Sequence, residues 1–275
     1  MFNTMEYILI RLVAIDLDGT LINPNLQISD NDIESIKKCR QNGVIVTIVT
    51  GRTIRSVGEI TDMLDLAGLH LASSGAVIID EKQEIHKALK IPEEMIKKIA
   101  QSSREWDRAI VYHTSNGFLK YEKYYPDLEY IAENKKFFKK VKDILASDIL
   151  TDSLQMTVLI DEDDEFNQYL KEIAGDTVKI RRAGPYFLNI LNKKAGKLSG
   201  VKEILKETGI KREDLMVIGD TELDIGIIRY AGVGVAMGNA SQRVKDAADY
   251  ISTSNSKSGV SKAINRYILS LKEKS

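Results

Sequence analysis

The 275-residue sequence has little of what several classes of protein require. It holds one cysteine, Cys39, which excludes an intrachain disulfide and any zinc site built on cysteine ligands. Its formal net charge is −1, so it lacks the basic excess with which nucleic-acid-binding proteins neutralise phosphates. The three histidines, His70, His86 and His113, do not have the spacing of metal ligands. We therefore expect no nucleic-acid partner.

Long apolar runs are lacking as well. The apolar residues 7–10 are followed by Arg11, and this stretch is too short for a membrane span and has no signal-peptide layout. We expect a cytoplasmic protein without a membrane partner. The remaining composition, 43% hydrophobic and 29% charged, is typical of a chain that buries a core, and the length suffices for one large or two modest domains.

Two acids follow the first strongly aliphatic segment. Residues 12–15 predict a buried strand, and Asp16 and Asp18 come directly after it. Alternation along an extended chain places both carboxylates on one side, at the carboxyl end of the strand, where open α/β sheets bind ligands. Two such carboxylates repel each other, and Mg²⁺ suits a pair of hard oxygen ligands. Taken alone, the same residues also form an ordinary acidic turn, in which Gly19 lets the backbone leave the sheet.

A second strand is predicted over residues 44–49 and ends in Thr50, Gly51 and Arg52. A helix between Ser29 and Gly43 joins the two strands, and strand, helix and strand together predict a parallel sheet with a right-handed crossover. The Thr50 hydroxyl and the Gly51 N–H can then donate to a phosphate oxygen beside Asp16. Taken alone, Thr50 is more typical of the N-cap of a following helix.

Two more charged positions follow late in the chain. Lys197 directly precedes a predicted helix that ends at Gly209, and a lysine at a helix start is unfavourable unless it faces an anion. Lys193 and Lys194 lie in the loop before it and are interpreted as exposed. A strand over residues 215–218 ends ahead of Asp220 and Asp224, again at a carboxyl strand end.

The middle of the chain has a different pattern. Residues 85–186 alternate short strands with helices and contain no phosphate-type motif, which predicts an α+β unit with one sheet covered on one face. We expect a hairpin of residues 109–113 and 118–122, and a basic helix over residues 128–142. The basic run is interpreted as a solvated face rather than a polyanion site, and comprises Lys135, Lys136, Lys139, Lys140 and Lys142. We interpret 85–186 as a domain inserted into an α/β domain of residues 1–84 and 187–275 with a doubly wound parallel sheet.

In their order along the chain these motifs resemble those of phosphatases of the haloacid dehalogenase (HAD) superfamily, in particular the Cof-type subfamily with a C2B cap. The motifs are Asp16-Leu17-Asp18-Gly19-Thr20, Thr50-Gly51-Arg52, Lys197, and Gly219-Asp220 with Asp224. The resemblance implies a Rossmann-like core and an inserted cap that covers the active site.

The resemblance also implies a role for each motif residue. Asp16 is the nucleophile that forms an aspartyl-phosphate, and Asp18 protonates the leaving oxygen and later activates water. Thr50 and Lys197 bind the transferring phosphoryl group, and further phosphate or substrate contacts come from Leu17, Gly51 and Arg52. A Mg²⁺ site is implied at Asp16, Asp18 and Asp220, with Asp224 in a supporting position.

The sequence departs from the Cof-type pattern at three positions. Ser74 stands where the subfamily usually has asparagine before Gly-Ala, and Leu198 stands where it has glycine after the motif lysine. Leu223 replaces an asparagine just before the last aspartate. Leucine cannot donate the hydrogen bond that such an asparagine gives to phosphate.

The first functional hypothesis is a Mg²⁺-dependent phosphomonoesterase for small phosphorylated metabolites, sugar phosphates in particular, acting as a monomer or weak homodimer. An acid two residues after the nucleophile favours hydrolysis, because water activation requires a base. A phosphomutase that uses the same aspartyl-phosphate is an alternative. A receiver-like signalling module phosphorylated on aspartate is another, since receivers also gather acids and a lysine on a doubly wound sheet.

Overall fold

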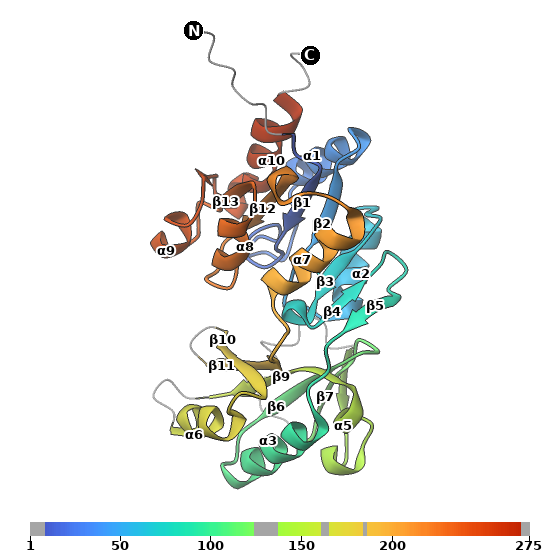
Figure 1. Cartoon of the computed structure of the whole chain (residues 1–275), viewed down its shortest axis with the longest axis vertical. Coiled ribbons are helices and arrows are strands. Elements are labelled where there is room, and N and C mark those ends of the chain that lie inside the picture. Colours follow the sequence, from blue (N-terminus) through green and yellow to red (C-terminus); the bar gives the residue numbers. More distant parts are fainter. Residues whose placement is uncertain (1–8, 124–136, 161–164, 184–185, 271–275) are drawn as a thin grey trace. The chain divides into compact units, whose positions relative to one another are not determined.

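The structure, a computed structural model, describes residues 9–123, 137–160, 165–183 and 186–270. The chain forms two compact units, shown in Figure 1. The core unit comprises Met1–Thr50, Ile60–Leu71 and Lys197–Ser275, and the insert unit comprises Gly51–Glu59 and Ala72–Gly196. The domain boundaries inferred from the sequence, 85–186 within 1–84 and 187–275, stay a prediction.

A five-stranded parallel sheet forms the centre of the core unit, in the order β14-β13-β12-β1-β2. Strand β1 (Leu12–Ile15) is fully buried between β12 (Leu215–Gly219) and β2 (Ile45–Ile48). The outer strands are β13 (Val233–Ala236) and β14 (Tyr250–Ile251). Beyond β2, Leu71 of β3 (His70–Ala72) pairs in parallel with Val49. Both faces of this sheet are covered by helices, so the aliphatic run of β1 needs no polar face.

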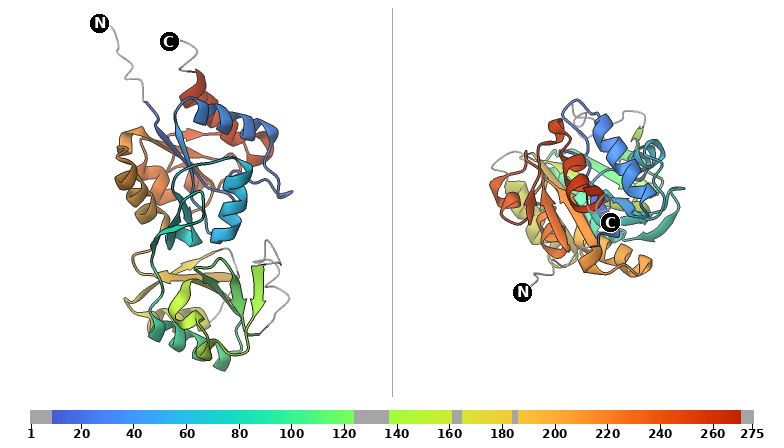
Figure 2. Two further views of the ribbon diagram at one scale, coloured as in Figure 1. Left: turned by 90° about the vertical axis from the view of Figure 1, so that its right-hand side faces the viewer. Right: turned by 90° about the horizontal axis from the view of Figure 1, so that it is seen from above.

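Helices cover both faces of this sheet. Helix α1 (Asp30–Gln41) packs with α10 (Gly259–Ile264) on one face, and α7 (Lys197–Thr208) packs with α8 (Ile225–Tyr230) on the other (Figure 2). The N-cap predicted for α1 is present, since the Ser29 side chain accepts from the Asp32 N–H. The predicted doubly wound α/β fold is confirmed. The remaining helical segments are α2 (Ile54–Met63), η4 (Arg212–Asp214), α9 (Gln242–Lys245), η5 (Asn255–Lys257) and η6 (Asn265–Leu269).

The insert unit contains a six-stranded sheet in the order β10-β11-β9-β6-β7-β8. One face packs on helices, with Met156 and Val158 of the sheet buried against Ile96, Ile99 and Phe166. The predicted hairpin forms, because β6 and β7 pair antiparallel. The elements of the sheet and its helices are α3 (Glu93–Glu105), β6 (Ile110–Thr114), β7 (Leu119–Tyr121), β8 (Phe138–Lys140), η3 (Ile144–Ala146), α5 (Ile149–Asp152), β9 (Ser153–Leu159), α6 (Glu165–Ala174), β10 (Val178–Arg182) and β11 (Phe187–Asn192). Before them come η1 (Ser73–Gly75), β4 (Val77–Ile79) and β5 (Ile85–Ala88), of which β4 and β5 pair antiparallel.

The helix predicted over residues 128–142 is wrong where the structure describes it. Residues 128–136 lie outside the described residues, and Phe138–Lys140 is strand β8, parallel to β7. The ring of Phe138 packs against Tyr121 with ring centroids 5.5 Å apart, while Lys139 and Lys140 are exposed. Pairing with β7 and burial of this ring outweigh the local helical preference of the lysine-rich segment.

A row of polar side chains occupies the face of the insert sheet opposite its helices. Thr157 Oγ1 donates to Asn189 Oδ1 at 2.9 Å and lies 3.1 Å from His113 Nε2, within hydrogen-bond distance. Gln155 lies beside them, and all four side chains are buried. Among the described residues His113 Nδ1 has no hydrogen-bond partner. Burial lowers the pKa of His113 to about 4, because it penalises the charged imidazolium.

No helix in the described part of the chain is long and apolar enough to cross a membrane. The cytoplasmic location stays a prediction.

Candidate active site

Three neighbouring strands end at one edge of the core sheet, and predicted site residues follow each of them. Asp16 follows β1 and its N–H donates to Ile218 O in β12 at 3.0 Å. Asp220 comes directly after β12, and Thr50 follows β2, where its N–H donates to Leu71 O at 3.0 Å. Asp16 and Thr50 are buried. Parallel pairing of β12, β1 and β2 therefore brings these three residues to the same edge.

Lys197 is the first residue of α7 and joins two of the predicted acids. Its Nζ donates to Asp16 Oδ1 at 2.7 Å and to Asp224 Oδ1 at 2.6 Å. The side chain is buried, with 7% of its surface exposed. The two carboxylates compensate for placing a cation at a helix N-terminus and away from water. Lys193 and Lys194 are exposed, and Lys193 pairs with Asp176 at 3.2 Å.

Burial close to other acids shifts the pKa values of Asp16 and Asp220. Burial raises the pKa of Asp16 well above its usual range, against the lowering effect of Lys197. Burial also raises the pKa of Asp220 to about 6, with a further upward contribution from Asp224. For Lys197 burial lowers the pKa, but the charges of Asp16 and Asp224 outweigh burial and raise it overall. When all three carboxyl groups of Asp16, Asp220 and Asp224 are ionised, the cluster carries more negative charge than one ammonium neutralises, and a bound cation would favour that ionised state.

The loop after Asp16 packs tightly against Asp220. Thr20 Oγ1 donates to Asp220 Oδ1 at 2.7 Å. Gly19 has φ of +82°, and a Cβ built on it would lie 2.2 Å from Asp220 Oδ2. A side chain at residue 19 would therefore displace the Asp220 carboxylate as well as strain the backbone.

Asp224 is fully buried, and both of its oxygens accept hydrogen bonds. Oδ1 accepts from Lys197, and Oδ2 accepts from Thr221 N–H at 3.0 Å and from Thr221 Oγ1 at 2.8 Å. This saturation fits a residue that orients Lys197 and the loop of Asp220 more than it fits a direct metal ligand.

Asp16 and Asp220 could hold a cation directly, with Asp224 beside them in the same cluster of three acids. One carboxylate oxygen from each lies within 4.8 Å of the others. Hard oxygen donors, a surplus of buried negative charge and raised pKa values of Asp16 and Asp220 suit a small divalent cation such as Mg²⁺. The residues present therefore fit the metal that the sequence predicts.

The structure places the remaining predicted site residues differently. Asp18 is exposed in the loop after β1. The side chain of Leu17 is fully buried, so only its backbone can face a ligand. Gly51 and Arg52 follow Thr50 directly in the chain but belong to the insert unit, where Arg52 O accepts from Ser73 N–H at 2.7 Å. Of the residues that replace family positions, Leu223 is 38% exposed and Ser74 is buried with φ of +54°.

Sequence reasoning assigned no role to Thr20 or Thr221, whose hydroxyls bind Asp220 and Asp224. Thr20 directly follows Gly19, and Thr221 directly follows Asp220. This adjacency to motif residues is the sequence signal that points to the two threonines as site residues. Their partners could not be read from adjacency alone, because Thr20 and Asp220 are 200 positions apart.

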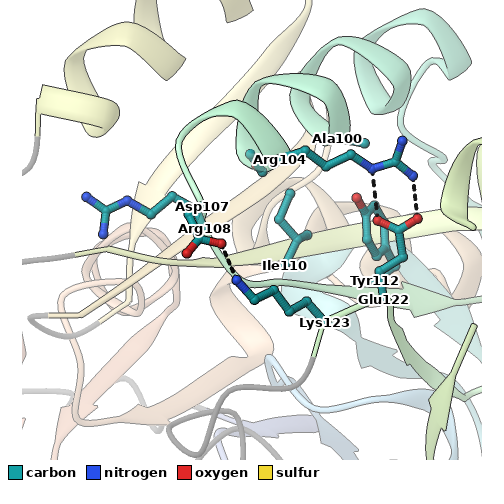
Figure 3. Close-up of a pocket in the computed structure, with 9 residues that line it drawn as sticks. Ala100, Arg104, Asp107, Arg108, Ile110, Tyr112, Glu122 and Lys123 are labelled. Carbon is teal, nitrogen blue, oxygen red and sulfur yellow. Dashed lines mark hydrogen bonds and ion pairs between the residues drawn. The ribbon is translucent and has the colours of Figure 1, made fainter.

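A separate cavity of about 160 Å³ lies in the insert unit, and no predicted site residue lines it (Figure 3). Arg104 bonds to Glu122 and to Asp143, and Lys123 pairs with Asp107. These bonds to Glu122 and Asp143 raise the pKa of Arg104. Four of the charged side chains that line this cavity are already paired with oppositely charged partners. They therefore provide little attraction for an ionic ligand.

Fold and site define a doubly wound α/β protein with an acid–lysine cluster at the carboxyl edge of its sheet. The chain belongs to the haloacid dehalogenase-like hydrolases, whose family model matches residues 13–264. The family resemblance predicted from the motifs is thereby confirmed.

Individual relatives support this assignment over nearly the whole chain. The chain is 29% identical to 5-amino-6-(5-phospho-D-ribitylamino)uracil phosphatase YcsE of Bacillus subtilis over 261 residues, which cover 94% of this chain and 96% of the relative. A haloacid dehalogenase-like hydrolase from Bacteroides thetaiotaomicron matches with a TM-score of 0.86 and 28% identity over 94% of this chain and 99% of that one. A sugar phosphatase of HAD subclass IIB matches with a TM-score of 0.80 and 26% identity over 94% and 98%.

Proposed function

We propose that the protein is a Mg²⁺-dependent phosphomonoesterase that hydrolyses small phosphorylated metabolites, sugar phosphates in particular, through an aspartyl-phosphate on Asp16. The enzyme class, a phosphoric monoester hydrolase, is confirmed by membership of the hydrolase family and by its phosphatase relatives. The observation that carries the mechanism is the buried ammonium of Lys197, 2.7 Å from Asp16 Oδ1. It supplies a fixed positive charge beside the nucleophile, where an incoming phosphoryl group brings negative charge.

Asp16 and Asp18 divide the chemistry between them. A carboxylate oxygen of Asp16 attacks phosphorus and forms the acyl-phosphate bond while the bond from phosphorus to the leaving oxygen breaks. Asp18 donates a proton to that leaving oxygen. In the second half-reaction Asp18 takes a proton from water, which attacks phosphorus, releases phosphate and restores Asp16. Asp18 is exposed, so solvent protons can reach it.

The other site residues bind and orient. Lys197 and the Thr50 hydroxyl neutralise or donate to phosphoryl oxygens, and backbone groups of Leu17 and Gly51 and the side chain of Arg52 add donors. Asp16, Asp220 and the backbone carbonyl of Asp18 would hold Mg²⁺, with Asp224 supporting Lys197 and the Asp220 loop. When bound, the metal offsets the charge of the carboxylates and the phosphate.

The substrate class rests on the relatives. One similar structure is a sugar phosphatase, and the phosphatase YcsE is named for a substrate with a phosphorylated ribityl chain. Both names describe phosphate esters of polyhydroxylated carbon chains. We assign the choice among such esters to the insert unit and to loops, where specificity commonly resides.

Hydrolysis of p-nitrophenyl phosphate by the full chain tests the proposal. We expect turnover with Mg²⁺, loss of turnover in EDTA and recovery on adding Mg²⁺. Asp16→Asn should abolish turnover without changing the circular dichroism spectrum, whereas Asp30→Asn, which alters an exposed acid in the first turn of α1, should leave the rate unchanged. Full activity in EDTA would contradict the metal requirement. Stoichiometric phosphorylation without turnover would contradict a hydrolase and favour a receiver-like module.

A further inference from the structure

The loop of residues 16–22 follows strand β1 and begins with the proposed nucleophile, Asp16. We call it the nucleophile loop, and hydrogen bonds among its own residues hold it. Leu21 N–H donates to Asp16 O at 3.3 Å, and Ile22 N–H donates to Leu17 O at 2.8 Å. Asp18 lies at the middle of this loop and forms a bridge with Ile22. Because its side chain is exposed, packing contributes little to the position of the Asp18 carboxylate. The backbone of the loop contributes to that position.

Two asparagines far away in the sequence bind carbonyl groups of this loop. Asn239 Nδ2 donates to Gly19 O at 2.8 Å, and Asn255 Nδ2 donates to Ile22 O at 3.0 Å. The two asparagines are linked to each other, since the Asn255 N–H donates to Asn239 Oδ1 at 3.0 Å. We call this pair the amide clamp. Its two carbonyl partners belong to the residue after Asp18 and to the residue bridged to Asp18.

We propose that the amide clamp of Asn239 and Asn255 positions Asp18 for proton transfer to the leaving oxygen. The inference rests on the acid–base role of Asp18 in the proposed function. A general acid acts only when its proton lies within hydrogen-bond reach of the oxygen that receives it. Small displacements of a catalytic group are costly in rate, so hydrogen bonds that fix the backbone at Gly19 and Ile22 bear directly on where the Asp18 carboxylate lies. Asn239 and Asn255 are therefore positioning residues that act through Asp18.

A general-acid defect can be told apart from a general loss of structure by changing the leaving group. Phenolate is a poor leaving group and needs its proton early, whereas p-nitrophenolate leaves with little protonation. The value of kcat/KM reports the half-reaction in which the leaving group departs. A misplaced Asp18 should therefore lower kcat/KM for phenyl phosphate far more than for p-nitrophenyl phosphate.

Asn239→Ala is the first variant, because Asn239 is exposed and its loss should not unfold the protein. We expect kcat/KM for phenyl phosphate to fall by about tenfold or more at saturating Mg²⁺, and that for p-nitrophenyl phosphate by less than about threefold. Asn239→Asp keeps an oxygen for the Asn255 N–H but cannot donate to Gly19 O, and should show the same selective loss. The matched control is Asn31→Ala. The exposed amide of Asn31 donates to Ser258 Oγ at 3.4 Å. Ser258 is close in sequence to Asn255 but does not belong to the nucleophile loop. It should change neither value.

Equal losses for the two substrates in both Asn239 variants, or no loss in either, would overturn the clamp while leaving the proposed function intact. Failure of the unmodified protein to hydrolyse either phosphate ester would instead overturn the proposed function, and the clamp with it. A selective loss in Asn31→Ala of the same size as in Asn239→Ala would also refute the assignment, because the effect would then belong to the C-terminal segment as a whole.

Discussion

At the scale of single residues, three lysines lie within five positions and only one is buried beside the acids. Lys197 contacts Asp16 and Asp224, whereas Lys193 and Lys194 are exposed. We expect Lys197→Ala to lower kcat by on the order of 10²-fold, because a preorganised charge at the transition state is lost. Lys193→Ala and Lys194→Ala are the controls and should each cost less than about tenfold. A larger loss in Lys194→Ala than in Lys197→Ala, measured on p-nitrophenyl phosphate, would show that the motif lysine has been misassigned.

Gly19 gives a second prediction at this scale. A Cβ there would lie 2.2 Å from Asp220 Oδ2, so Gly19→Ala should displace a carboxylate of the proposed metal site and raise the Mg²⁺ concentration needed for half-maximal activity. Gly43→Ala is a matched control, because Gly43 has a similar φ of +76° with no atom within 4 Å of its built Cβ. Both variants should lose about 1 kcal/mol of stability from the positive φ. An equal effect of both on the Mg²⁺ requirement would contradict the contact with Asp220.

At the scale of elements, the sheet of the insert unit buries His113 in its uncharged form. In the unfolded chain a histidine titrates near pH 6.5, whereas burial lowers the pKa of His113 to about 4 in the folded state. Between these two values the unfolded state binds a proton that the folded state does not. The free energy of unfolding should therefore fall as the pH falls through this window, by on the order of 2 kcal/mol from pH 7 to pH 5.

Urea unfolding at the two pH values checks this prediction. Trp106, the single tryptophan of the sequence, follows α3 and its ring centroid lies 5.4 Å from that of Phe166, so its fluorescence reports on the insert unit. His113→Gln removes the titration and should remove that part of the pH dependence. His86→Gln, a change at an exposed histidine in β5, should retain it. The same pH dependence in His113→Gln as in the unmodified protein would contradict the role of His113.

At the scale of the whole molecule, the two units divide the proposed function. Asp16, Lys197, Asp220 and Asp224 all belong to the core unit. Replacing residues 88–183 with a short linker should therefore leave hydrolysis of p-nitrophenyl phosphate in place, while rates on different sugar phosphates should become more alike. Circular dichroism of the shortened chain checks that the core has folded. A shortened, folded chain with an unchanged substrate profile would contradict a role of the insert unit in selection.

The sequence by itself determined where the core strands lie along the chain and which polar residues follow them. Aliphatic runs followed by Asp16, Thr50 and Asp220 are local patterns, and parallel pairing of the strands brings such ends to one edge. Local pattern failed at residues 138–140, where pairing with β7 makes a strand out of a segment with helical composition. The alternation of β9 was likewise insufficient to show that Gln155 and Thr157 would form a buried polar row with His113.

Only the tertiary structure decided which distant groups bind one another. Lys197 and Asp16 are 181 positions apart, and Asn239 and Gly19 are 220 apart. Hydrogen bonds of this kind form when strand pairing and helix packing have already brought the two segments together, so no periodicity or neighbouring residue encodes them. For that reason the sequence names the acids and favours Lys197 over its two neighbours, whereas the packed core shows which acids Lys197 binds and supplies the threonines that bind Asp220 and Asp224.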